Sequence, residues 1–131
     1  MLRYIELTSG YHHDGPAWIA NVSTSRSGQT IYFNNHALKR LEGGGSSGNH
    51  VDLETGDEYW VSGVKKEGGD RHWAGCGSVL VERAALAEYL ALRGRTELDP
   101  YYEVTDDIAP TDPQRFVELE NNSMMAMGRQ G

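Results

Sequence analysis

The sequence predicts a mainly β domain of the α+β class: a small rolled or barrel-like antiparallel sheet, with one helix after a three-stranded meander. Short runs rich in strand-forming residues alternate with glycine-bearing turns such as ETGD (54–57) and KKEGGD (65–70). One run, 82–92, has the spacing of an amphipathic helix. A chain of 131 residues suits one domain, which we place at 1–120, with a disordered tail at 121–131.

The N-terminal part predicts a first strand and a hairpin. The run LRYIELT (2–8) is short and rich in strand formers. The runs 18–24 and 30–33 flank SRSGQ, where Gly28 would supply the positive φ that a tight turn needs. The segment 36–41 is too short to assign to a strand or a helical turn.

The glycine-rich segment GGGSSGN (43–49) resembles a phosphate-binding loop only in composition. A loop of that kind needs a lysine and opens a helix, whereas this segment has no lysine and leads into a strand. We therefore expect a flexible loop here.

The stretch from 48 to 92 organises the rest of the chain. It predicts strands at 50–53, 58–64 and 71–81, which would form the three-stranded meander. The helix at 82–92 follows, and Gly94 stands where a left-handed C-terminal cap belongs.

The C-terminal third predicts one more strand and a docked irregular segment. The strand is expected at 101–105, just after Pro100. Two prolines in 108–120 favour irregular structure, which Phe116 and Val117 would hold against the body.

Two long strings carry a resemblance to known proteins. They are SRSGQTIYFNNHALKR and GNHVDLETGDEYWVSGVKKEGGDRHWAGCGSVLVERAALAEYL. The chain resembles a group of small bacterial cytosolic proteins that share SGxTIYF, ETGxEYWxSGVKK and DRHWAG segments, and the likeness covers roughly 1–120. That group has no established activity, so the resemblance implies no catalytic residue and no cofactor.

Composition narrows the classes of partner. The net charge is −7, and it is uneven: residues 1–95 hold ten basic and eleven acidic side chains, and 96–131 hold two and eight. Such a balance disfavours non-specific binding to nucleic acid. We expect a cytoplasmic protein without a membrane segment, because no run resembles a signal peptide or approaches about 18 apolar residues.

The predicted binding site is the hairpin face of 60–76, where cationic and aromatic side chains gather. Such a surface can hold a phosphate or stack a base. The candidate binding residues are Trp60, Lys65, Lys66, Asp70, Arg71, His72 and Trp73.

Catalytic and metal-binding alternatives are weaker. His72 and Cys76 would stand about 13 Å apart in a regular strand, too far for a nucleophile and its base. Five histidines and one cysteine show no CxxC or HxxxH spacing, although His50 and His72 would meet Asp52 or Asp70 in one strand register. We therefore assign no catalytic residue, no metal and no cofactor.

Three functional hypotheses follow. The first is a non-enzymatic binding or interaction module, using the 60–76 hairpin face or the acidic C-terminal strip to bind a protein or a small anionic ligand. The second is a small enzyme acting on a phosphorylated or nucleotide-like substrate through Asp70, Arg71 and His72. The third is a structural homodimer that pairs exposed strands.

Overall fold

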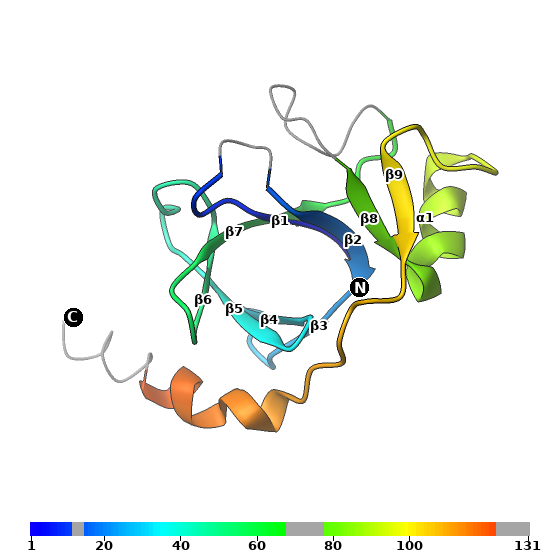
Figure 1. Cartoon of the computed structure of the whole chain (residues 1–131). Coiled ribbons are helices and arrows are strands. Elements are labelled where there is room, and N and C mark those ends of the chain that lie inside the picture. The colour runs from blue at the N-terminus through cyan, green and yellow to red at the C-terminus, as the bar shows by residue number, and fades with distance from the viewer. Residues whose placement is uncertain (12–14, 68–77, 123–131) are drawn as a thin grey trace.

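The computed structural model describes residues 1–11, 15–67 and 78–122 (Figure 1). These residues form one nine-stranded sheet with the order β3-β4-β5-β6-β7-β1-β2-β8-β9. The strands are β1 (Leu2–Leu7), β2 (Ala17–Asn21), β3 (Ser23–Thr24), β4 (Thr30–Phe33), β5 (His36–Arg40), β6 (His50–Asp52), β7 (Glu58–Gly63), β8 (Val79–Glu82) and β9 (Tyr102–Thr105). The predicted mainly β fold is confirmed.

Seven of these strands, from β3 round to β2, curl into a half-barrel (Figure 1). Val22 carries the chain directly from β2 into β3, so one continuous run contributes to both ends of the curl. The predicted hairpin is present as the β3–β4 pair, and Gly28 has the expected positive φ of 77°. Its first half, β2, pairs instead with β1 and β8.

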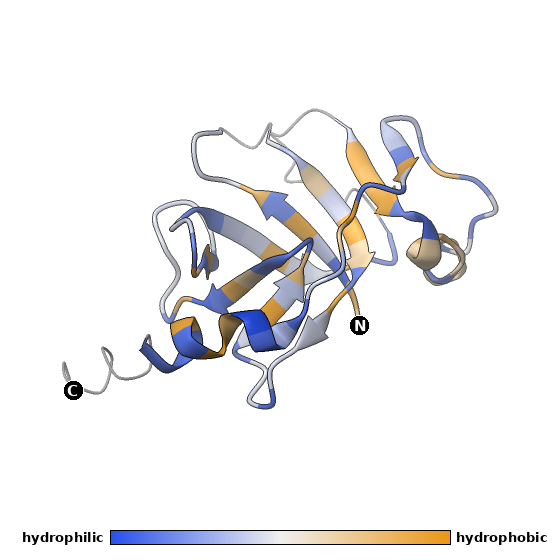
Figure 2. Cartoon of the chain, turned by 60° about the horizontal axis from the view of Figure 1, so that its bottom comes forward, coloured by the Kyte–Doolittle hydropathy of each residue, from blue (hydrophilic) through white to orange (hydrophobic). Residues whose placement is uncertain are grey.

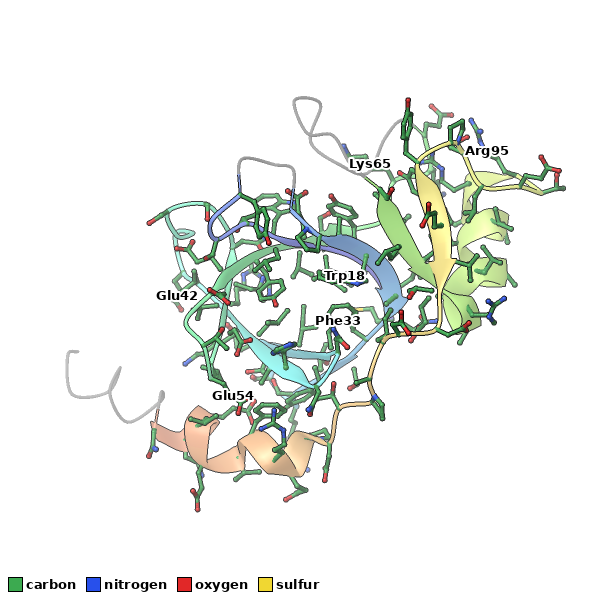
Figure 3. All side chains as sticks on the ribbon, in the orientation of Figure 1. Trp18, Phe33, Glu42, Glu54, Lys65 and Arg95 are labelled. Carbon is green, nitrogen blue, oxygen red and sulfur yellow. The ribbon has the colours of Figure 1, made fainter. Side chains whose placement is uncertain are left out.

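Inside the curl lies an apolar core. Trp18 packs edge-on against Phe33 with ring centroids 5.4 Å apart, and Figure 3 shows both side chains within the ring of strands. Side chains from every strand of the half-barrel except the two-residue β3 and the more polar β6 join this cluster: Ile5, Ala20, Val22, Ile31, Phe33, Leu38, Tyr59 and Val61.

The third strand of the predicted meander occupies a different place. Only β6 and β7 pair in that region; β8 lies parallel to β2 and to β9. Between β8 and β9 run the short 3-10 helix η1 (Arg83–Ala85) and α1 (Leu86–Arg93), which make a strand–helix–strand crossover. Tyr89 of α1 is buried against the outer face of the sheet, and α1 ends at Gly94 in the predicted left-handed conformation.

The C-terminal segment is helical where irregular structure was expected. The 3-10 helix η2 (Pro113–Phe116) continues as helix to 122, because Pro113 suits a first helical position and the Asp112 carboxylate accepts a hydrogen bond from the Gln114 amide at 3.0 Å. Phe116 is fully buried beside Tyr32, as predicted, whereas Val117 is exposed. Figure 2 shows this segment lying along the outside of the half-barrel. No helix in the described ranges is both long and apolar enough to cross a membrane.

Candidate functional site

A cavity of about 820 Å³ opens at one end of the half-barrel. Its lining comes from the start of β1, the ends of β5 and β7, the start of β6 and the turn before β4. The chemically informative lining residues are Arg3, Ile31, Arg40, His50 and Val61. The mouth of a curled sheet is a common position for a ligand site.

Strand periodicity explains why polar groups reach this cavity. On β5, alternate residues share a face, so Arg40 points to the same side as the buried Leu38. Arg40 pairs across the strands with His50, and Leu38 pairs with Asp52. The interior of the half-barrel is therefore apolar in the middle and polar at both ends of β5 and β6.

Two guanidinium groups give the cavity a positive charge. Arg3 donates one hydrogen bond to its neighbour's carbonyl, at 2.9 Å. Within the described part of the chain, no salt bridge involves Arg3 or Arg40. Among the described residues of the lining, Glu42 is the only acidic one. This cationic site stands out in a chain whose net charge is −7.

His50 is a buried, neutral member of the site. Burial, assisted by the nearby Arg40 charge, lowers the pKa of its imidazole to about 4. Its Nδ1 lies 2.8 Å from Oδ1 of Asn49, an oxygen that already accepts the Val61 N–H. Because that oxygen cannot donate, Nδ1 carries the proton and Nε2 is left as an acceptor.

The glycine-rich loop forms one wall of the cavity and is held in place. The Glu58 Oε1 atom accepts hydrogen bonds from the amides of Ser47 and Gly48 at 3.1 and 3.0 Å. A Cβ atom at Gly48 would lie 2.4 Å from the backbone oxygen of Tyr59, so only glycine allows this approach. The end of the loop is thus anchored to β7 through Ser47 and Gly48.

The predicted hairpin site is only partly described. Asp70, Arg71, His72 and Trp73 lie outside the described residues, as does Cys76, so their predicted roles stay predictions. Three candidates are placed.

Trp60 is 46% exposed on the outer face of β7, opposite Glu6 of β1. It therefore points away from the cavity that its neighbour Val61 lines. Lys65 and Lys66 follow β7 in exposed positions, and the Lys65 carbonyl accepts a hydrogen bond from Arg93 at 3.1 Å. Figure 3 shows Lys65 well apart from the labelled interior pair Trp18 and Phe33.

Sequence reasoning missed the arginines of the cavity. A signal for them was present in the sequence. Every second residue of a strand lies on one face, and on that face the sequence has His36, Leu38 and Arg40 in one strand and His50 and Asp52 in the next. This pattern indicates a buried face with a polar residue at each end. His50 and Asp52 were considered together as metal ligands. They stand at the two ends of the three-residue β6, where Asp52 contacts His36 and His50 faces Arg40.

Comparisons of the chain with protein-family models, with curated proteins and with solved structures found no match. Inference about function therefore starts from the residues of the cavity.

Proposed function

We propose that this chain is a binding module for a small anionic ligand, which it takes up in the cavity at the end of the half-barrel. One observation carries the proposal: Arg3 and Arg40 line the same cavity, and neither has a carboxylate partner among the described residues. A charged group without a counter-ion at a cavity wall is well suited to a ligand of opposite charge.

The lining defines the chemistry of the ligand. Arginine recognises carboxylate and phosphate groups with two parallel hydrogen bonds. The Nε2 atom of neutral His50 accepts a hydrogen bond, so it favours a ligand that also carries a hydroxyl or amine donor. Ile31 and Val61 supply apolar surface for a short carbon chain. The best fit is a small hydroxy acid or a similar oxyanion with a donor group.

The proposal keeps the predicted class, a non-enzymatic module with a small anionic ligand, and moves the site. The hairpin face of 60–76 and the enzyme hypothesis both depend on Asp70, Arg71 and His72, which lie outside the described residues. Arg3, Arg40 and His50 of the cavity all lie within the described residues, so their chemistry can be stated.

The test is calorimetric titration of the full chain with glycolate, acetate and inorganic phosphate at low ionic strength. We expect saturable binding of one glycolate or phosphate per chain, and weaker binding of acetate, which lacks the donor. Arg40→Gln and Arg3→Gln should each weaken binding by about tenfold or more.

Arg83→Gln is the matched control, because Arg83 is also exposed but pairs with Asp106 outside the half-barrel. This variant should bind like the wild type. Failure of glycolate and phosphate to bind, or an equal loss in the Arg83 variant, would show that the cavity is not an anion site.

A further inference from the structure

The opposite end of the half-barrel carries a second polar cluster. His36 begins β5, Asp52 ends β6, and Glu54 stands in the turn that follows. Each offers one ligand atom, and the three atoms lie within 4.8 Å of one another. This cluster is about 13 Å along β5 from the anion cavity, at about 3.3 Å per residue.

Asp52 is the most buried residue of the cluster. Its side chain is 1% exposed, and its Oδ1 atom accepts hydrogen bonds from the Glu54 and Thr55 amides at 2.8 and 3.4 Å. Its Oδ2 atom lies 2.8 Å from Nδ1 of His36. Nevertheless, neither Oδ2 nor this Nδ1 atom has a hydrogen-bond partner in the described structure.

These two buried atoms lie within ion-pair distance of each other, but they do not have the alignment of a hydrogen bond. A lone pair of a buried carboxylate needs a proton donor or a cation, because burial removes its water. Two ligands held about 2.0–2.1 Å from one zinc ion in its usual tetrahedral geometry are themselves about 3.3 Å apart. The separation of 2.8 Å between Asp52 Oδ2 and His36 Nδ1 is shorter than this, so zinc binding requires the partly exposed His36 side chain to move outward by about 0.5 Å.

We propose that His36 Nδ1, Asp52 Oδ2 and a carboxylate oxygen of Glu54 bind one divalent transition-metal ion, with Zn²⁺ as the best match. One imidazole and two carboxylates suit Zn²⁺ better than Mg²⁺ or Ca²⁺, which prefer oxygen ligands alone. The His36 and Glu54 side chains are each 33% exposed, so the ion is reached from solvent and keeps a coordination position facing outward.

Arg115 is the positioning residue of this site. Its guanidinium donates to both Glu54 oxygens at 2.6 and 2.7 Å and to the backbone oxygen of Asn35 at 3.0 Å. A carboxylate has about four lone-pair positions, so each oxygen of Glu54 retains one for a metal. Arg115 therefore ties the turn that carries Glu54 to the turn that precedes His36, in the manner of an outer-shell ligand.

The test is calorimetric titration of the chelator-treated full chain with ZnCl2, and separately with MgCl2. We expect one Zn²⁺ per chain at this site and no comparable Mg²⁺ uptake. His36→Gln and Glu54→Gln should each abolish this uptake, and circular dichroism checks that each variant is folded before titration. Nitrogen chemical shifts of the His36 ring should move when Zn²⁺ binds to the wild type.

Asp106→Asn is the matched control, because it removes an exposed carboxylate that pairs with Arg83 outside the half-barrel. Its Zn²⁺ uptake should equal that of the wild type. The proposal is overturned if the wild type takes up no stoichiometric Zn²⁺, if Mg²⁺ competes on equal terms, or if uptake persists in His36→Gln and Glu54→Gln.

Discussion

Asn49 makes two hydrogen bonds with the backbone of Val61. Its Nδ2 donates to the Val61 carbonyl and its Oδ1 accepts from the Val61 N–H, each at 2.8 Å. These two hydrogen bonds resemble the bonds between paired strands, so the Asn49 side chain extends the hydrogen-bonded pairing of β6 with β7 by one residue. The same Oδ1 fixes the proton of His50, so one amide links the sheet, the loop wall and the cavity.

Replacing Asn49 tests that link. In Asn49→Asp the carboxylate cannot donate to the Val61 carbonyl, and a negative charge comes to lie beside His50 Nδ1. We expect a loss of about 1–3 kcal/mol in the free energy of unfolding and a rise in the His50 pKa from about 4. Urea unfolding and an NMR titration measure the two effects.

Asn21→Ala is the control for this change, because Asn21 is exposed at the end of β2. It should alter stability by no more than about 0.5 kcal/mol. An unchanged His50 pKa in Asn49→Asp would mean that the amide does not govern the imidazole.

The buried His50 makes stability depend on pH. Its pKa is about 4 in the folded chain and 6.5 ordinarily, so the unfolded chain binds a proton that the folded chain excludes. The stabilising effect is complete above pH 6.5 and is lost as the pH falls towards 4. After allowance for solvent screening, we expect the loss to be about 1–2 kcal/mol.

Urea midpoints measured between pH 4 and pH 7 check this expectation. His50→Gln should flatten the curve in that range relative to the wild type. The same slope in both proteins would assign the effect to other groups.

The close approach of Gly48 to Tyr59 makes a steric prediction. Gly48→Ala places a Cβ atom within 2.4–2.9 Å of three backbone atoms of Tyr59, so the loop must shift. We expect a loss of about 1–3 kcal/mol in stability and weaker anion binding. Gly63→Ala is the matched control, because a Cβ atom there meets nothing within 4 Å. Equal stability of the two variants would contradict the contact.

Arg115 should hold the C-terminal helical segment on the half-barrel. It bridges Glu54 and Asn35, and its guanidinium stacks 4.3 Å from the ring centre of Phe116. The hydrogen bonds from Arg115 also lower the pKa of Glu54. In Arg115→Gln we expect faster amide exchange over 113–122 and a Glu54 pKa closer to its ordinary value.

NMR exchange and a carboxylate titration measure these changes. Arg95→Gln serves as the control, because Arg95 pairs with Asp99 in the loop after α1. Exchange over 113–122 that is equally slow in both variants would mean that other contacts, such as Phe116 in its cluster and the Tyr32–Glu120 hydrogen bond, hold the segment.

Local signals in the sequence were sufficient for most elements. The alternation of inward-facing and outward-facing residues predicted β1 and β7. Gly28 and Gly94 predicted a turn and a helix end, and the structure confirms both. The helix after 112 was also readable, because Asp112 and Pro113 form a cap and a first helical position. The two prolines were instead interpreted as breakers.

The pairing of strands that are far apart in the sequence could not be predicted from the sequence. The order strand, helix, strand from β8 to β9 favours a parallel crossover, yet the partner of β8 on its other side is β2, some sixty residues away. Predicting the cavity would also have required knowledge of this strand pairing. Arg3 and Arg40 share it only because β1 and β5 are joined through two intervening strands in one register.

The continuous run from β2 through Val22 into β3 has a consequence for the order of assembly. Every pairing within the half-barrel joins residues between 2 and 63, whereas the elements that cover its outer faces come from 79 onward. During synthesis the inner wall and both polar ends are therefore complete in the chain before α1 and the C-terminal segment emerge. The residues that cover the half-barrel are thus the last part of the fold to be synthesised.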